Sequence, residues 1–449
     1  MLEEVLARFE EHAPLSVMMR LALEQAMPAG WIDEVFERTR QTQYPRELLF
    51  STVVRLTSLV SLGLRPSLHA AAKKEAQLPV SIAALYDKVR RTEPAILSRL
   101  VQDSAQRLLP VVQALGVTPS LPGWQLRVLD GNHLPASEKR LAPLRSCRAA
   151  ALPGHTLVVY DADGGLVTDI VPCKDAHAQE RAVMGPLCWQ RAQPQQLWMA
   201  DRNFCTRDIM QGWHQGGAAF IVREHAKHPR LTEQGPWVAC ARVETGLLRE
   251  QAICIEQGQA PWRRIELQLD EPTEDGDTVI RLWSNLPEQV NAQQIARLYR
   301  KRWRIEHMFQ RLESVLHSEI RSLGHPRAAL LGFAVAILAY NVLHLLKHSV
   351  EQAHRQDLPE LDVSTYYIAV DLRAEYEGML IVLPAQAWAS WSDADPRRIA
   401  DRLLELARRL NPKRLATHKR APKVKKPKGY VDAAVARSHV STARVLGMA

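Results

Sequence analysis

Several patterns that mark other classes of protein are missing from this sequence. Its six cysteines include no CxxC pair, no charged-then-apolar secretory pattern opens the chain at Met1, and no segment is repeated along it. The chain has 449 residues, of which 46% are hydrophobic and 24% charged, so it can bury a sizeable core. We therefore expect a cytoplasmic protein that folds by packing, with reduced and mostly buried thiols.

Long apolar runs are also scarce, and a single one stands out. Ala328 to Leu346 is 19 residues without a formal charge, which is close to the length that spans a bilayer. The same composition suits a helix buried on all sides in a large core. Because Gly332, Asn341 and His344 interrupt the run, we expect the buried helix and no membrane partner.

Acidic residues are absent from one stretch near the end of the chain. Between Asn411 and Lys428 there are eight basic residues and no acidic one, so the net charge of +9 leaves 9 − 8 = +1 for the rest. Such a tail can neutralise DNA phosphates, and each contact adds about 0.9 to the salt dependence of binding. Its three prolines are typical of a segment that is disordered when free, and both interpretations can hold together. The basic residues are Lys413, Arg414, Lys419, Arg420, Lys423, Lys425, Lys426 and Lys428.

The first 120 residues show apolar residues at three- and four-residue spacing, which predicts a helical domain. The expected helices are Leu2 to His12, Leu15 to Ala26, Arg46 to Leu62 and Ala95 to Leu115.

Two shorter helical patterns in this domain, Ser67 to Glu75 and Ser81 to Arg91, are joined by a short turn. The second ends on Lys88, Arg90 and Arg91. A helix-turn-helix that enters the major groove has this layout, and so do two ordinary helices. We take the three basic residues as candidate DNA contacts.

From about Trp124 the pattern changes to short β-type runs that alternate with helices, which predicts an α/β layer with a mixed sheet. The expected strands are Gln125 to Leu129, His155 to Tyr160, Leu166 to Pro172, Gln196 to Ala200 and Ala218 to Arg223, and the expected helices are Ala176 to Gln193 and Thr206 to Gln215.

The alternation stops at about residue 236, where four consecutive strands predict an all-β insertion over 236–286. Helices follow to the end of the ordered pattern. The strands are Trp237 to Thr245, Leu248 to Ile255, Trp262 to Leu269 and Thr278 to Ser284, and the helices are Val290 to His317, Ala328 to Lys347 and Arg397 to Leu410.

Two aspartates stand where β-runs end. Asp130 follows Gln125 to Leu129 and precedes Gly131, and Asp201 follows Gln196 to Ala200. Such positions hold a carboxylate rigidly while it reaches solvent, as a ligand of Mg²⁺ or Mn²⁺ must. Either residue taken alone fits a turn or a helix cap equally well.

A third element lies on the helix expected from Val290. At about 100° per residue, Tyr299, Arg302 and Glu306 fall within about 60° of one another and share a face. Taken alone, they also fit an ordinary polar flank beside the apolar stripe of Leu298, Ile305, Met308, Phe309, Leu312 and Leu316.

These residues resemble the Y-(2)-R-(3)-E-(6)-K signature of bacterial insertion-sequence transposases of the IS-four family. Tyr299, Arg302 and Glu306 match its first three positions, and Asp130 and Asp201 resemble the family's two aspartate motifs, Val-Leu-Asp-Gly and Met-Ala-Asp-Arg-Asn-Phe. The resemblance covers about 124 to 347 and includes the β-strand insertion. It implies an RNase H-like core in which the three carboxylates bind two Mg²⁺ or Mn²⁺ ions.

The resemblance also implies that Tyr299 and Arg302 hold a DNA strand near the scissile phosphate. The substrates would be double-stranded element ends with terminal inverted repeats, and target DNA, bound by a homodimer. Water would attack first and the freed 3′-hydroxyl next. Members of the family can flip a base onto an aromatic of the insertion, for which Trp262 and Trp283 are candidates, although both also suit a core.

The sequence departs from the signature at Glu313, where the family has lysine. This exchange removes a phosphate contact and places a negative charge on the face of Glu306; Arg311 lies on the other side of the helix. A DNA-binding protein that no longer cuts is therefore one alternative. Another nuclease with the same core and a membrane protein built on Ala328 to Leu346 are further alternatives.

The expected organisation is thus α/β, with an RNase H-like mixed-sheet core and a helical N-terminal domain. The parts are a DNA-binding domain (1–120), the catalytic core (121–347) with its insertion (236–286), a helical region (348–410) and the basic tail (411–449).

Overall fold

The structure is a computed structural model that describes residues 2–43, 47–75, 78–134, 141–147, 151–183, 185–227, 229–255, 261–273, 276–418 and 440–448. Five of the predicted tail contacts lie outside these ranges, namely Lys419, Arg420, Lys423, Lys425 and Lys426.

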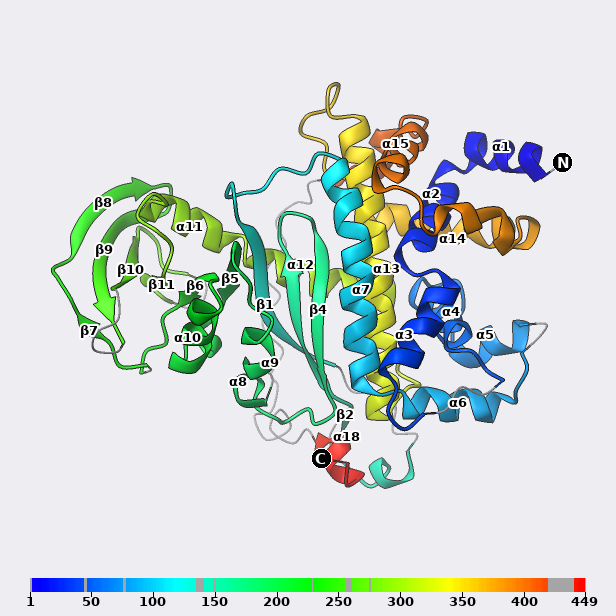
Figure 1. The fold of residues 1–449 in the computed structure, drawn as a ribbon, viewed down its shortest axis with the longest axis horizontal. Helices are drawn as coiled ribbons and strands as arrows, with labels where there is room; N and C mark the ends of the chain where they lie inside the picture. The colour runs from blue at the N-terminus through cyan, green and yellow to red at the C-terminus, as the bar shows by residue number, and fades with distance from the viewer. Residues whose placement is uncertain are drawn as a thin grey trace.

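A ten-stranded mixed sheet forms the centre of the molecule, in the order β4-β3-β1-β5-β6-β11-β10-β9-β7, with β8 also paired to β9 (Figure 1). The strands β1, β5 and β6 run parallel, and the other neighbours are antiparallel. The predicted α/β class with a mixed sheet is confirmed, and the arrangement is compatible with an RNase H-like core. The strands of this part are β1 (Gln125–His133), β3 (His155–Asp161), β4 (Leu166–Cys173), β5 (Gln196–Ala200) and β6 (Ala219–Arg223).

Residues of one strand alternate between the two faces of this sheet, and each face has its own core. Val128 and Met199 pack into the larger cluster, which includes residues of α7 (Pro94–Ala114). Leu129 and Ala200 pack into the smaller cluster, which includes residues of α10 (Arg207–Gln215). Both faces are therefore covered, as the apolar strand sequences require.

The region in which an all-β insertion was expected forms strands that extend the core sheet. Its strand β11 (Val279–Ser284) pairs antiparallel with β6, and β10 (Trp262–Leu269), β9 (Gly246–Cys254) and β8 (Val238–Val243) follow outward. A short strand β7 (Thr232–Glu233), which the sequence did not predict, pairs with β9. The curved lobe at the left of Figure 1 is this extension.

The N-terminal region is helical, as predicted, and contains one helix that the prediction missed, α3 (Ala29–Thr39). The side chains of Ser67 and Ser81 cap the two short helices by accepting hydrogen bonds from Ala70 and Ala84. The other helices are α1 (Leu2–His12), α2 (Pro14–Ala26), α4 (Phe50–Ser61), α5 (Leu68–Lys74) and α6 (Ile82–Arg91).

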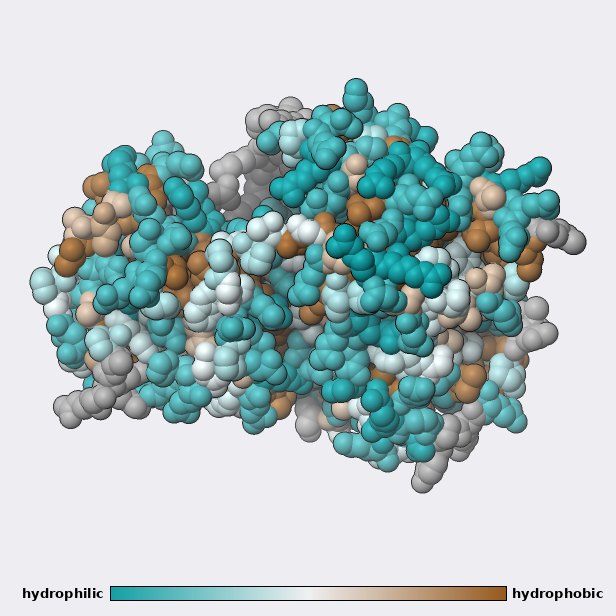
Figure 2. All heavy atoms as spheres, turned by 45° about the horizontal axis from the view of Figure 1, so that its top comes forward, coloured by the Kyte–Doolittle hydropathy of each residue, from teal (hydrophilic) through white to brown (hydrophobic). Residues whose placement is uncertain are grey.

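The long apolar helix is α13 (Pro326–Ala353), the one helix among the described residues that is long and apolar enough to cross a membrane. Its apolar window is wholly buried, so the buried-helix prediction is confirmed. In Figure 1, α13 lies beside α7, between the sheet and the N-terminal helices. Figure 2 shows a mainly hydrophilic face with hydrophobic residues in small, scattered patches.

The C-terminal part adds helices around α13, and its last described segment forms a separate two-stranded sheet with β2 (Ala151–Leu152). Strand β12 (Val440–Ser441) pairs with β2. The predicted helix from Arg397 is α15 (Pro396–Ala407), whereas α14 was not predicted. The remaining elements are α14 (Thr365–Val382), η3 (Ala385–Trp391), α16 (Pro412–Leu415), α18 (Thr442–Val445) and η1 (Ala142–Leu144).

Two further expectations need correction. The helix predicted over 176–193 is two short helices, α8 (Glu180–Val183) and α9 (Gly185–Trp189), and the chain forms turns before them. The thiols were expected to be mostly buried, but only Cys188, Cys205 and Cys254 of the six cysteines are buried, and Cys240 is exposed.

Candidate active site

Asp130 and Asp201 lie side by side because β1 and β5 are parallel neighbours. Their register pairs Leu129 with Ala200, so the next residue on each chain is an aspartate. Alternation directs both toward the face of Val128 and Met199. Asp130 was expected at the end of its strand, which is wrong: β1 continues to His133 because β3 pairs with it along that length.

Asp201 follows the last residue of β5 as predicted, and its carboxylate has a local role as well. It caps the short helix η2 (Arg202–Phe204) and accepts a hydrogen bond of 2.8 Å from the Asn203 backbone N–H. This bond orients one carboxylate oxygen, and the second oxygen of a carboxylate can accept from or bind a further partner.

The predicted single helix from Val290 is in fact two helices, α11 (Ala292–Arg300) and α12 (Trp303–Leu316). At the junction the backbone forms tighter three-residue hydrogen bonds, from Arg302 N to Tyr299 O and from Ile305 N to Arg302 O. A side chain holds the turn in place, since Arg304 Nη1 donates to the Ala162 carbonyl at 2.6 Å. Tyr299 therefore stands on α11, Arg302 at the junction and Glu306 on α12.

The Arg302 guanidinium joins two of the three predicted carboxylates. Its Nη1 lies 3.3 Å from Asp130 Oδ2, and its Nη2 lies 3.0 Å from Glu306 Oε1. The carboxylates of Asp201 and Glu306 both act electrostatically on Asp130. Three acidic groups from β1, the end of β5 and α12 therefore converge on one place, where they surround the positively charged side chain of Arg302.

Negative charge is crowded at this place. Burial raises the pKa of Asp130; Arg302 opposes that shift, Asp201 and Glu306 add to it, and the pKa comes to about 7. A single guanidinium thus does not offset the cost of three neighbouring carboxylates. Oxygen donors crowded in this way fit hard divalent cations such as Mg²⁺ or Mn²⁺.

Tyr299 and Arg302, the predicted contacts to a DNA strand, are both 8% exposed. Burial raises the pKa of Tyr299 to about 12, although Arg302 opposes that shift. The Arg302 guanidinium lies 4.9 Å from the ring centroid of Trp303, which is itself half exposed. In this conformation the two residues face the carboxylates and not solvent.

The predicted DNA contacts of the N-terminal domain lie at the end of α6. Lys88 turns toward the protein, where it donates to the Leu48 carbonyl and lies 4.9 Å from the ring centroid of Phe36. Burial lowers its pKa. Arg90 and Arg91 are exposed, and Arg90 forms an ion pair with Asp87. The two exposed arginines are thus the better placed of the three for an external phosphate.

The two tryptophans considered for a flipped base are core residues. Trp262 and Trp283 are 2% and 1% exposed, and Trp283 Nε1 donates to Glu224 at 2.7 Å. Neither ring has a free face in this structure.

A residue that the sequence analysis missed, Glu180, lies beside the aspartate motifs. Its Oε2 accepts a hydrogen bond of 3.1 Å from Asn203 Nδ2, and Asn203 also holds Asp201. A Cβ on Gly131 would lie 1.7 Å from Glu180 Oε1, so a larger residue after Asp130 would displace the Glu180 carboxylate from this position. The expectation of one continuous helix over 176–193 hid this residue, which begins α8.

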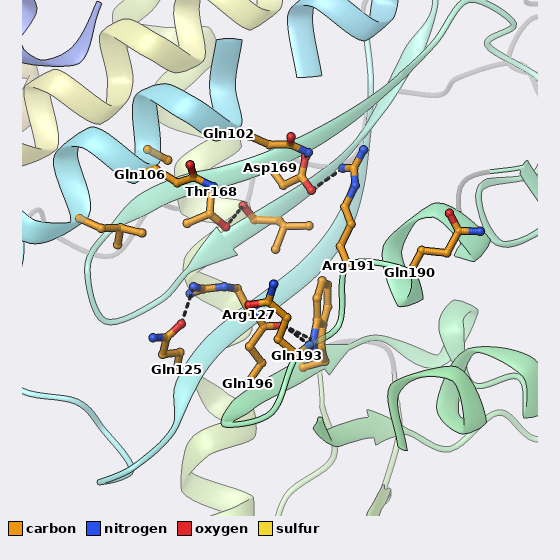
Figure 3. Close-up of a pocket in the computed structure, with 14 residues that line it drawn as sticks. Gln102, Gln106, Gln125, Arg127, Thr168, Asp169, Gln190, Arg191, Gln193 and Gln196 are labelled. Atoms are coloured by element: carbon orange, nitrogen blue, oxygen red, sulfur yellow. Dashed lines mark hydrogen bonds and ion pairs between the residues drawn. The ribbon is translucent and has the colours of Figure 1, made fainter. Parts of the chain in front are cut away.

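A polar pocket of about 470 Å³ lies near the other end of β1, where Gln125 and Arg127 line it (Figure 3). Its polar groups bind one another: Gln102 Nε2 donates to Asp169 at 2.8 Å, and Arg191 pairs with the same carboxylate. Because these polar side chains pair with one another, the pocket has fewer unpaired charges for a ligand than the carboxylate site has.

Two comparisons with known proteins were informative to different degrees. No curated protein matches the chain. Residues 127–342 match the family model described as "Transposase DDE domain", a range that begins in β1, ends in α13 and contains all three carboxylates, and this match supports a DDE transposase.

Proposed function

We propose that the protein is a transposase of the IS-four family that cleaves and joins DNA at the terminal inverted repeats of an insertion sequence. Asp130, Asp201 and Glu306 would be its metal-binding catalytic residues. The observation that carries the proposal is the convergence of these three carboxylates around the Arg302 guanidinium, within the region that matches a transposase DDE domain.

A DDE domain implies the use of a divalent metal, and the three carboxylates would hold two Mg²⁺ or Mn²⁺ ions. Such ions activate a water molecule and stabilise the leaving oxygen during phosphoryl transfer. Asp130 and Asp201 stand on adjacent strands of a buried sheet, so their spacing is fixed before substrate binds. Glu306 comes from a separate helix and would complete the ligand set.

Arg302 has a second part in this proposal. It forms ion pairs with both Asp130 and Glu306. Once these carboxylates take other partners, its guanidinium is released and becomes a donor for the phosphate of the bound strand. Tyr299, buried beside Arg302, would set the direction in which it turns.

The remaining parts of the proposal concern DNA and assembly. Arg90 and Arg91 at the end of α6, with Lys88 beside them, would contact the element end. The tail residues around Lys423 would neutralise phosphates. Two copies of the chain would hold paired element ends in the cytoplasm, at the nucleoid.

The test uses linear DNA that bears the inverted repeats flanking the reading frame, incubated with purified protein with and without Mg²⁺. Asp201→Asn keeps the shape of the side chain and removes its charge. We expect cleavage at the repeats to require Mg²⁺ and to fall at least about a thousandfold in this variant, because electrostatic stabilisation is a large part of such catalysis. Asp208→Asn, an exposed aspartate on α10, is the matched control and should cleave normally.

Other outcomes would identify other functions. Binding to the repeats that needs no metal and leaves both strands intact would indicate a DNA-binding protein without catalysis, in line with Glu313 in the place of lysine. Metal-dependent cleavage with no preference for the repeats would indicate another RNase H-like nuclease. Equal cleavage by Asp201→Asn and wild type would refute the assignment of the site.

A further inference from the structure

A second group of metal-binding side chains lies on the other face of β1. His133, His155 and Glu180 each offer one donor atom, and these three atoms lie within 4.8 Å of one another. Leu129, on the same strand, points to this face because it packs into the smaller core, and His133 is four residues further along. The carboxylate of Asp130 points to the opposite face, so the two sites are separate.

The fold places these three residues by strand register. In the antiparallel pair β1 and β3, His133 lies directly opposite His155, and their ring centroids are 5.1 Å apart. Glu180 reaches the pair from the start of α8, across Gly131, where any larger residue would block its carboxylate. His155 Nδ1 lies 4.0 Å from Glu180 Oε1, which is too long for a hydrogen bond.

His155 is the residue that points to a ligand. It is fully buried, and within the described part of the chain neither of its ring nitrogens has a hydrogen-bond partner. A buried polar atom without a partner costs roughly 1–3 kcal/mol, so such atoms need an explanation.

We propose that His133, His155 and Glu180 bind a transition-metal ion, with Zn²⁺ as the best match. Two imidazole nitrogens and one carboxylate oxygen are a ligand set that Zn²⁺ accepts, whereas Mg²⁺ prefers oxygen donors alone. The ion supplies the partner that the ring nitrogens of His155 lack among the described residues. His133 is exposed, so the site opens to solvent on its side and water can complete the coordination.

The site would also act on the catalytic carboxylates through a short chain of contacts. With Glu180 Oε1 on the metal, Glu180 Oε2 remains the acceptor for Asn203 Nδ2. The backbone N–H of Asn203 in turn orients Asp201. A bound metal would hold this chain rigid in the way that groups beyond the direct ligands stabilise catalytic sites. The role is positional, and the zinc site itself can be tested without any cleavage assay.

The test is a calorimetric titration of chelator-treated, full-length protein with Zn²⁺ alone, in the presence of excess Mg²⁺. We expect one Zn²⁺ per chain in wild type. His133→Asn and Glu180→Gln should each weaken binding at least about tenfold. His307→Asn, which changes an exposed histidine on α12, and Asp201→Asn should bind as wild type does. His133 is exposed, so its replacement should leave the fold intact.

Two further measurements make the outcome clear. Zn²⁺ should raise the unfolding temperature of wild type and not that of His133→Asn, and Co²⁺ should give a visible absorption band that the same substitution removes. Zinc binding that is absent from wild type, or unchanged in both His133→Asn and Glu180→Gln, would overturn the proposal. Asp201→Asn separates the two sites, since it should lose DNA cleavage and keep its zinc.

Discussion

Helix α13 is buried and the three carboxylates of the candidate site are half-buried, and the polar groups of the two regions are paired in opposite ways. In α13, the fully buried Asn341 accepts a hydrogen bond from Val167 N and donates one to Val167 O, each 2.8 Å long. These bonds complete the outer edge of β4, the first strand of the sheet. At the carboxylate site, one guanidinium serves two carboxylates, and its own Nε has no partner among the described residues.

The difference indicates what each region is built for. A buried side chain that forms hydrogen bonds with the backbone of an edge strand stabilises the fold, and it requires no ligand to do so. Crowded carboxylates that share one guanidinium reduce stability, and they persist where a ligand or a reaction needs them. The comparison predicts opposite signs: substitution should destabilise the protein at Asn341 and stabilise it at Asp130.

The largest effect on stability is expected from Asn341→Ala. The substitution leaves the N–H and C=O of Val167 buried without partners, and each such group costs roughly 1–3 kcal/mol. We expect the free energy of unfolding to fall by about 2–4 kcal/mol. Chemical denaturation of variant and wild type, compared at equal dependence on denaturant concentration, would measure the change in the free energy of unfolding. Gln352→Ala, at the half-exposed C-terminal end of the same helix, is the control and should change it little.

A loss below about 1 kcal/mol would contradict this account of Asn341. It would mean that water reaches Val167 in the variant and that the edge of β4 is less enclosed than α13 makes it.

The same contrast explains which parts of the fold could be predicted from the sequence. Two strands were predicted closely: β5 and β10 have the predicted bounds. The helix α13 was predicted as buried from three interruptions of its apolar run, one of which is Asn341. Local patterns suffice where the apolar run of one continuous segment decides the structure.

Other features depend on contacts between distant segments. The break between α11 and α12 was missed because three-residue and four-residue turns keep nearly the same apolar spacing, and a contact to the Ala162 carbonyl helps to hold it. The continuity of the insertion with the core sheet depends on the pairing of β11 with β6. Glu180 was missed for the same reason: only the fold brings it to Gly131.

A smaller effect of opposite sign is expected from Asp130→Asn in metal-free protein. Because the pKa of Asp130 is raised to about 7, its protonated form is favoured in the folded state. The cost of the charge is therefore absent below about pH 4, grows toward pH 7 and is complete above it. The variant should be more stable than wild type by roughly 1–3 kcal/mol at pH 8, and equal to it at pH 4.

Thermal unfolding across this pH range would measure the difference. Asp208→Asn, on the exposed surface of α10, should show no gain at any pH. A variant that is less stable than wild type at pH 8 would show that the ion pair with Arg302 outweighs the crowding of charge, and the contrast with Asn341 would fail.

The smallest effect concerns the exposed Glu313, where the resembled family has lysine. Burial raises the pKa of Glu319 to about 7, and the neighbouring charge of Glu313 adds to this shift. Negative charge is therefore crowded here too.

If DNA passes this face of α12, Glu313→Lys should strengthen binding of the element end by about fivefold, or roughly 1 kcal/mol, and steepen its salt dependence by about 0.9. Glu360→Lys makes the same change in net charge on the loop between α13 and α14. Fluorescence anisotropy at several salt concentrations would compare them; equal gains in both variants would show that only net charge matters and would remove α12 from the DNA path.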